Sequence, residues 1–477
     1  MSLLNNARWV AMSQACKIGA QVVGMMVLAR LVAPDEYGLM AMAAVVTNFA
    51  IIFRDMGSSA AIIQRQVLDD ETKTTVFWFN ICVGTTIAVV VVAIAPWMVQ
   101  IFNAPRLFGV LLLMALAFPI SSCTAAHQAL LERESKFKAV ARVEIISTMV
   151  GLVVAIAMGW AGMGVYSLVA QTLIMMGLSS LQLWLISDWH PGGFRQASWP
   201  CLRSIFGFSS NLVGFNIINY FSRNADNIII GHYFAAAVLG AYSLAYRVML
   251  FPLQSLTFVV SRSMYPLLSK QQSNMPLMRQ TYLKVVAVIA ALVAPMMAGM
   301  LVLREQFIEL FLGKGWELSS LLLLWLAPTG FIQSILSTTG VVFMATAATR
   351  TLMMLGVVGA VLQVGAFMLG IHGGVELMVK FYLLANIVNA VPVLILCMKQ
   401  LEGTALDLIR VTWVPVVSAI VMAFFVDMLE NVTNLGNSAI VLSVGAFGGL
   451  VFYMALYFIL DRRTACEMLS SLRFRNG

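Results

Sequence analysis

Charged residues are scarce in this sequence, and their scarcity excludes an ordinary soluble enzyme. Of its 477 residues, 10% are Asp, Glu, Lys or Arg and 61% are hydrophobic, whereas a typical soluble domain has about 25% charged residues. With a mean hydropathy of +0.90, the chain has too few polar side chains to cover a globular surface in water. It is therefore predicted to be a membrane protein whose body lies in the bilayer.

The sequence also lacks the patterns typical of disulfide, metal or catalytic sites. Its six cysteines show no CxxC pair and no histidine at metal-ligand spacing, so they are interpreted as small buried hydrophobic residues. It contains no GxSxG, Walker or HExxH motif, and no long loop outside the apolar runs that would hold two carboxylates. We expect no catalytic residue, no metal and no cofactor, and the chain is predicted not to be an enzyme.

Long hydrophobic runs are abundant instead. A bilayer core about 30 Å thick needs roughly 20 apolar residues per helix, and fourteen segments meet this length. They are 9–31, 38–62, 76–102, 107–131, 140–160, 163–187, 204–232, 236–261, 281–303, 318–345, 350–371, 375–398, 408–427 and 438–460. The first run has no small-residue cleavage site after a short apolar core, so it is predicted to be a membrane helix and not a cleaved signal peptide. The expected fold class is an all-α polytopic membrane protein with about 14 transmembrane helices.

The distribution of basic residues predicts the orientation of the chain. With a cytoplasmic amino terminus, 21 of the 29 Lys and Arg residues fall in cytoplasmic segments and four fall in outer loops, as the positive-inside rule requires. Both termini are therefore predicted to be cytoplasmic. The net charge of +8 is explained by this bias and by contact with anionic lipid head groups, so nucleic acid is not an expected partner.

An internal repeat predicts two related halves. Three short matches occur in the same order in both halves, and they align Gly38 with Gly240, Pro119 with Pro328, and Gly164 with Gly374. Each repeat holds six predicted helices, and an even number makes the two copies parallel, related by an axis along the membrane normal. The predicted divisions are an N-lobe at 1–190, a C-lobe at 200–400, two added helices at 405–460 and a basic cytoplasmic tail at 461–477.

Ionisable residues inside the predicted helices are the candidate functional residues. A charge at the bilayer centre costs about 2.5–3.5 kcal/mol on insertion scales, so such a residue usually faces a cavity or a partner. The basic candidates are Lys17, Arg30, Arg54, Arg223, Arg247 and Lys380, and the acidic candidates are Asp55, Glu144, Asp226 and Glu376. Because basic residues are in excess, the sequence predicts a cavity that accepts an anion.

Structural explanations compete with function at most of these positions. Arg247 lies about 11 residues from either end of its predicted helix, too deep for its head group to reach water easily, and is the strongest cavity candidate. Lys17, Arg30 and Lys380 have long stems that reach an interface from within a helix. Arg54 and Asp55 end a helix, where an interface position would be ordinary.

The remaining candidates have partners close by in the sequence. Arg223 and Asp226 are three residues apart on one helix face and are able to neutralise each other. Glu144 is able to pair with Arg142 or Lys138 on its own helix. His127 and His372 are isolated near helix ends, where we expect hydrogen-bonded structural histidines rather than pH switches.

Four segments carry a resemblance to a known family. They are VLARLVAPDEYGL at 27–39, FRDMGSSAAIIQR at 53–65, NYFSRNADNIIIG at 219–231 and LGAYSLAYR at 239–247. With them the chain resembles, over essentially its whole length, the bacterial polysaccharide flippases of the multidrug/oligosaccharidyl-lipid/polysaccharide superfamily. The similarity is greatest to the exopolysaccharide exporters of the colanic-acid type.

The resemblance implies a fold, a substrate and a location. It implies a MATE-like fold of two six-helix lobes around a central cavity in the bacterial inner membrane. We expect a monomer, because two lobes in one chain need no partner to form a pathway. The resemblance also implies alternating access that moves an undecaprenyl-diphosphate-linked oligosaccharide repeat unit to the outer leaflet, with a polysaccharide polymerase as a further partner. Lys17 and Arg54 approximately match cavity arginines of the related lipid-linked peptidoglycan precursor flippases, although position 17 is a lysine here. Asp55 and Asp226 are the candidates for proton or cation coupling.

Two other functions remain open from the sequence. A cation-coupled multidrug exporter of the same superfamily would favour acidic cavity residues for cationic drugs, which the basic excess argues against. A membrane-embedded polysaccharide polymerase or ligase would need a substantial outer loop with catalytic Arg and His, and the predicted outer loops are short.

Overall fold

The computed structural model describes residues 3–54, 62, 68–198, 220, 224–433 and 438–462. Every regular element in these ranges is a helix, and ten helical stretches among them are long and apolar enough to cross a membrane. The predicted all-α membrane fold is confirmed. The count of fourteen spans stays a prediction, because most of the expected span at 204–232 lies outside the described residues.

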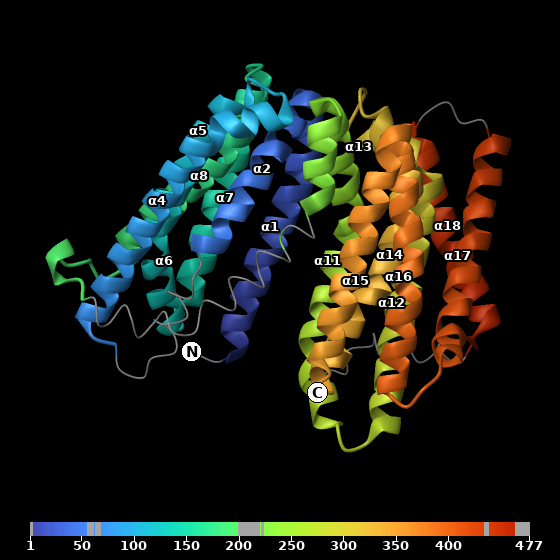
Figure 1. Ribbon diagram of the computed structural model, residues 1–477. Helices are drawn as coiled ribbons and strands as arrows, with labels where there is room; N and C mark the ends of the chain where they lie inside the picture. The colour runs from blue at the N-terminus through green and yellow to red at the C-terminus, as the bar shows by residue number, and fades with distance from the viewer. Residues whose placement is uncertain are drawn as a thin grey trace. The chain divides into compact units, whose positions relative to one another are not determined.

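The chain divides into two compact units, Met1–Gly240 and Ala241–Gly477. The helices of the first unit are α1 (Leu3–Leu31), α2 (Pro34–Arg54), α4 (Asp70–Phe102), α5 (Leu107–Ala115), α6 (Ala117–Arg133), α7 (Phe137–Trp160), α8 (Val165–Ile186), the short η1 (Phe194–Gln196) and a helix over 224–233 (Figure 1). Within this unit α7 packs against both α1 and α8, and α4 packs against α6. The lobe limits predicted from the repeat remain a prediction.

The second unit is also entirely helical in its described residues. Its elements are most of α11 (Ala236–Lys270), α12 (Met275–Val302), α13 (Arg304–Phe311), α14 (Glu317–Ala345), α15 (Thr349–Gly370), η2 (Ile371–Gly373), α16 (Gly374–Gln400), α17 (Ala405–Thr433) and α18 (Ser438–Leu460). Here α12 packs against α14 and α17, and α16 packs against α14 and α15. α13 is a short helix that the hydropathy of the sequence did not predict, because charged residues alternate with its apolar ones.

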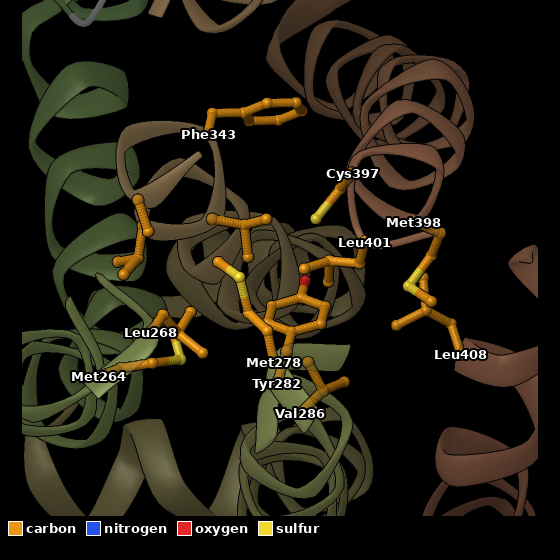
Figure 2. Packing of buried hydrophobic residues seen from close by; sticks show 13 residues of the cluster. Met264, Leu268, Met278, Tyr282, Val286, Phe343, Cys397, Met398, Leu401 and Leu408 are labelled. Carbon is orange, nitrogen blue, oxygen red and sulfur yellow. The ribbon is translucent and has the colours of Figure 1, made fainter. Parts of the chain in front are cut away.

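The core of the second unit shows why apolar runs become packed helices here. Met264 and Leu268 from α11 meet Tyr282 from α12, Phe343 from α14 and Cys397 from α16, all at most 2% exposed (Figure 2). The one polar atom of the tyrosine is satisfied, because its hydroxyl lies 3.2 Å from the hydroxyl of Thr338. Dispersion contacts and satisfied polar groups, rather than a hydrophobic driving force, hold helices together in a bilayer.

One predicted span is confirmed as the candidate span Leu107–Arg133, but its helix is interrupted at one residue. The segment expected as a single helix over 107–131 consists of α5 and α6, which are separated at Leu116. Pro119 has no N–H to donate to the carbonyl of Ala115, so the regular hydrogen-bond ladder is interrupted there. The Leu116 N–H bonds instead to the Leu113 carbonyl at 3.1 Å, a tighter turn.

The segment that follows α8 folds back onto the start of α4. Trp78 Nε1 donates to the Gly192 carbonyl at 2.8 Å, and the Ser198 N–H donates to the Thr75 hydroxyl at 3.0 Å. The Trp189 ring lies 6.1 Å from the Phe77 ring, edge to face. Residues 187–198 are therefore part of the first unit and not a free linker.

Two glycines that the repeat aligns touch each other's helices. A Cβ on Gly38 would lie 1.8 Å from the carbonyl oxygen of Ala236, and a Cβ on Gly240 would lie 1.8 Å from the carbonyl oxygen of Pro34. All four residues belong to the first unit. The first turns of α2 and α11 thus approach as closely as backbone allows, and only glycine leaves room for that approach.

Candidate functional site

Lys17 forms an ion pair that the sequence pattern did not predict. It lies at the middle of α1, and its ammonium is 2.7 Å from Oε1 of Glu144 on α7. The hydroxyl of Ser13, one turn earlier on α1, donates to Oε2 of the same carboxylate. The expectation that Glu144 pairs with Arg142 or Lys138 on its own helix is wrong, because α7 turns Glu144 toward α1.

This ion pair is partly accessible. The side chains of Lys17 and Glu144 are 35% and 28% exposed. Each end of α1 is 14 residues from Lys17, or about 21 Å at 1.5 Å per residue. Within the candidate membrane span Arg8–Leu31, the lysine is nine residues from the start, or about 14 Å at 1.5 Å per residue, close to its predicted depth. At this depth the pair lies within the hydrophobic core of a bilayer.

Arg30 does not join Lys17. It lies in the last turn of α1 with an exposed side chain. Thirteen residues on a helix correspond to about 20 Å along the axis and about 140° around it. The basic candidates on α1 are thus spread along the helix and do not form one cluster.

The acidic candidate Asp226 is described, whereas its expected partner is not. Asp226 lies in the helix over 224–233 and is 4% exposed, and its Oδ1 accepts the N–H of Asn227 at 2.7 Å. Arg223 and Asp55 lie outside the described residues, and so does the side chain of Arg54 at the end of α2. The predicted contact between Arg223 and Asp226 therefore stays a prediction.

In the second unit the two basic candidates differ in setting. Lys380 pairs with Glu376 one turn earlier on α16 at 2.8 Å, and its ammonium lies 4.8 Å from the centre of the Trp325 ring. Arg247 has an exposed side chain on α11. α11 continues to Lys270, nine residues beyond its predicted end, so Arg247 lies in its first half and not at its centre.

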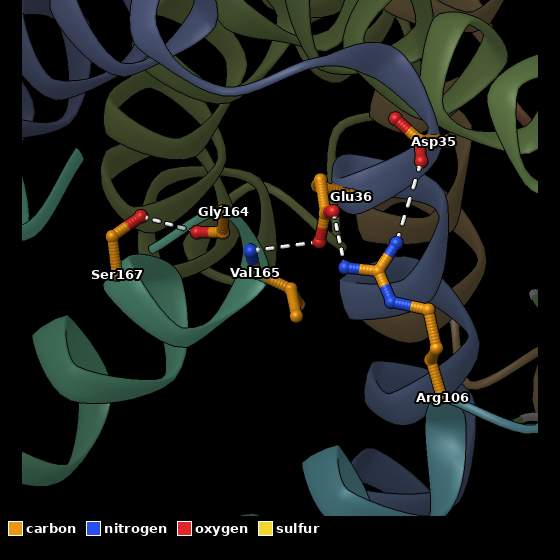
Figure 3. Close-up of polar contacts among 6 residues, drawn as sticks. All are labelled: Asp35, Glu36, Arg106, Gly164, Val165 and Ser167. Carbon is orange, nitrogen blue, oxygen red and sulfur yellow. Dashed lines mark hydrogen bonds and ion pairs between the residues drawn. The ribbon is translucent and has the colours of Figure 1, made fainter. Parts of the chain in front are cut away.

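The sequence reasoning missed a polar cluster at the helix starts of the first unit. Arg106, just before α5, pairs with Glu36 and lies 3.7 Å from Asp35, both in the first turn of α2 (Figure 3). The other oxygen of Glu36 accepts the N–H of Val165, the first residue of α8, at 2.9 Å. The hydrogen bond that Arg106 donates to the Glu36 carboxylate raises the pKa of Arg106 above its usual value. This cluster ties three helix ends together and has a structural role, because a carboxylate at a helix start satisfies free N–H groups.

His127 departs from its expected setting. It is fully buried, and its ring lies 4.9 Å from that of Trp184 and 5.4 Å from that of Trp189. Neither ring nitrogen has a hydrogen-bond partner among the described residues. Among the described residues the expectation of a hydrogen-bonded histidine is therefore wrong, and the imidazole packs against the two tryptophan rings instead.

The described residues offer little for a metal or for an enclosed anion. They contain no group of three or more His, Cys, Asp or Glu side chains placed to hold a metal ion. A pocket of about 160 Å³ in the second unit is lined by apolar side chains, including Met297 on α12, Phe331 on α14 and Ile420 on α17. Among the described residues, exposed or half-exposed basic side chains are available to bind an anion. Of these, Lys17 lies deepest in its helix.

Known proteins resemble the chain over most of its length. It is 25% identical over 422 residues to the lipopolysaccharide biosynthesis protein WzxC of Escherichia coli (strain K12), covering 86% of this chain and 84% of that protein. It is also 25% identical to the succinoglycan biosynthesis transport protein ExoT of Rhizobium meliloti (strain 1021), covering 99% and 96% of the two chains.

A solved structure shares the fold, and a family model matches the sequence. The lipid II flippase MurJ in an inward closed conformation superposes with a TM-score of 0.75 at 13% identity, over 97% of this chain and 99% of that one. The model of the family described as polysaccharide biosynthesis protein matches residues 27–321. These findings confirm the resemblance to the polysaccharide flippases of the superfamily. The chain belongs to this polysaccharide biosynthesis family.

Proposed function

We propose that the chain flips undecaprenyl-diphosphate-linked oligosaccharide repeat units from the cytoplasmic to the outer leaflet of the bacterial inner membrane. The observation that carries this proposal is the half-exposed Lys17–Glu144 pair in the middle of a spanning helix. The names of the relatives, in polysaccharide biosynthesis and transport, support it. An ammonium group at that depth is placed to bind an anionic substrate as it crosses the hydrocarbon core of the membrane.

Physical chemistry explains why such a substrate needs a transporter with basic side chains. A diphosphate with a hydrated sugar does not cross about 30 Å of hydrocarbon unaided, whereas a polyprenyl tail remains in lipid throughout. Lysine and arginine replace water around the phosphate oxygens with charge-assisted hydrogen bonds. An inside-negative potential favours outward movement of an anion by about 2.3 kcal/mol per charge per 100 mV.

The roles of the individual residues belong to the same proposal. Lys17, Arg30, Arg54, Arg223, Arg247 and Lys380 are the proposed contacts along the substrate path, through alternating access. Asp55 and Asp226 are the proposed sites of proton or cation coupling. The chain acts as a monomer with both termini cytoplasmic and delivers its product to a polymerase at the outer face.

Leaflet-resolved labelling of lipid-linked repeat units tests the proposal. Cells depleted of the protein should accumulate these units on the cytoplasmic side, and restoring the wild type should clear them. Lys17→Ala and Arg247→Ala should restore transport by no more than about a tenth, since losing a charged hydrogen bond costs about 1.5–3 kcal/mol. Lys314→Ala, on an exposed loop residue, is the matched control and should behave as wild type.

Two results would contradict the proposal. If depleted cells deliver the units outward normally and lose only chain polymerisation, the chain is a polymerase component. If both alanine variants transport normally, the charged residues do not contact the substrate.

A further inference from the structure

The Lys17–Glu144 pair has a composition that simple substrate binding does not require. A phosphate site needs a cation, yet here the cation is already bound to a carboxylate at 2.7 Å. The carboxylate is itself held by the hydroxyl of Ser13, so both of its oxygens have a partner from α1. Ser13 and Lys17 are one turn apart and therefore lie on the same face of that helix.

Other cations near Glu144 are engaged elsewhere or lie outside the contact. Lys138, two turns earlier on α7, places its ammonium 5.3 Å from the centre of the Trp9 ring. Arg142 has an exposed side chain. α8, which packs along α7, contains no Asp, Glu, Lys, Arg or His between Val165 and Ile186. Among the described residues, Lys17 is thus the cation whose charge Glu144 neutralises.

The pair is placed where its partners are able to separate. Two side chains that are 35% and 28% exposed are reachable from outside the contact of α1 with α7. A lone ammonium at this depth costs about 2.5–3.5 kcal/mol on insertion scales. When no substrate is bound, the transporter would have this unpaired ammonium in the membrane unless an anionic side chain of the protein pairs with it.

We propose that Glu144 is the resident counter-anion of Lys17, which the diphosphate of the substrate displaces in each transport cycle and which returns when the substrate leaves. The inference rests on the proposed flipping function and concerns the same site. Lys17 exchanges one anionic partner for another, while Ser13 continues to donate to the released carboxylate. The empty transporter then resets with its charge neutralised, and Glu144 is a positioning residue for Lys17.

Competition between two anions for one cation has a distinctive signature. Removing the carboxylate charge by Glu144→Gln should tighten diphosphate binding by about tenfold, equal to ~1.4 kcal/mol. The same change should slow transport at saturating substrate, because Lys17 is unpaired during the return step. A purely structural salt bridge would weaken binding and transport together.

Equilibrium binding of undecaprenyl diphosphate to the full-length chain in lipid nanodiscs tests the inference. Glu144→Gln should bind more tightly than wild type, and Glu144→Asp, which keeps the charge, should return toward wild-type affinity. Glu132→Gln is the matched control, because the Glu132 carboxylate accepts from Gln128 on its own helix at 2.8 Å, and it should leave affinity unchanged. In a Lys17→Gln background, Glu144→Gln should have no further effect.

Outcomes separate this inference from the proposed function. If wild type flips the lipid-linked substrate but Glu144→Gln binds no more tightly, the counter-anion role is wrong and flipping stands. If the effects of Lys17→Gln and Glu144→Gln on binding simply add, the two residues do not compete for one position and the inference is again wrong. If wild type neither binds undecaprenyl diphosphate nor moves the lipid-linked substrate, the proposed function itself fails.

Discussion

At the scale of single residues, His127 is expected to destabilise the fold, because its imidazole is buried without a hydrogen-bond partner among the described residues. Its imidazole is fully buried next to the rings of Phe77, Trp184 and Trp189, and neither nitrogen is hydrogen-bonded by a described residue. A buried polar group that lacks a hydrogen bond costs about 1–3 kcal/mol. His127 therefore weakens the unit in which it lies unless its nitrogens serve a purpose during transport.

Replacement of this histidine tests that position. We expect His127→Leu, similar in volume and without polar atoms, to raise the free energy of unfolding by about 1 kcal/mol. His372→Leu, at an exposed position, is the control and should change stability little. Thermal unfolding in detergent measures both variants. A clear loss of stability in His127→Leu would show that the imidazole has a partner that stabilises the fold.

The sequence singled out Lys17 and Glu144 but did not predict that they pair with each other. Lys17 was identified because a lysine inside an apolar run is rare and costly. Its partner was missed because Glu144 lies on a helix far along the chain, while Lys138 and Arg142 are neighbours within two turns. Sequence spacing reports contacts along one helix, whereas the contact of α1 with α7 is set by tertiary packing.

At the scale of the helices, the approach of α2 to α11 depends on two glycines. Cβ atoms at Gly38 or Gly240 would meet backbone oxygens at 1.8 Å, and backbone does not move aside as a flexible side chain does. Repeat alignment found both glycines, and the structure supplies the reason for them. Each glycine is the fifth residue of its helix, next to the point where the beginnings of the two helices meet.

Alanine at these positions should force the helices apart. We expect Gly38→Ala and Gly240→Ala each to lower the free energy of unfolding by about 1–3 kcal/mol, the usual cost of overpacking. Gly19→Ala on α1 is the matched control, since nothing lies within 4 Å of its added Cβ, and a helical glycine replaced by alanine gains stability. Thermal unfolding of the three variants in detergent measures these changes. Equal stability of all three variants would mean that the close approach of the helices does not contribute to stability.

Helix existence was predictable, and helix ends were less so. Apolar runs identified the described spans, because the thickness of the hydrocarbon core fixes how many consecutive apolar residues a span needs. The break at Leu116 and the extension of α11 to Lys270 were missed. A hydropathy profile does not detect the missing N–H of a proline. It also misses the part of a helix that extends beyond the bilayer, because charged residues there lower the hydropathy.

At the scale of the whole molecule, the charge distribution makes a prediction about the membrane. α12 has 28 residues, or about 42 Å at 1.5 Å per residue, enough to cross the hydrocarbon. The exposed residues Ser273 before it and Lys314 after it are predicted to lie in the cytoplasm and outside, respectively. This orientation is predicted because basic residues are concentrated near Ser273, and the positive-inside rule places such residues in the cytoplasm.

Cysteine labelling checks this orientation. In a cysteine-free background, an impermeant thiol reagent applied to cells with a permeabilised outer membrane should label Lys314→Cys and not Ser273→Cys. Disruption of the inner membrane should make both react, which controls for accessibility. Labelling of Ser273→Cys alone in the intact cells would reverse the orientation and, with it, the proposed direction of transport.

The segment at 187–198 has a consequence for the order in which the protein is made. Its contacts at Thr75, Phe77 and Trp78 all come earlier in the chain than the segment itself. During synthesis from the amino terminus, each of these partners has left the ribosome before residue 198 does. This end of the first unit therefore has all of its partners available before most of the second unit is synthesised.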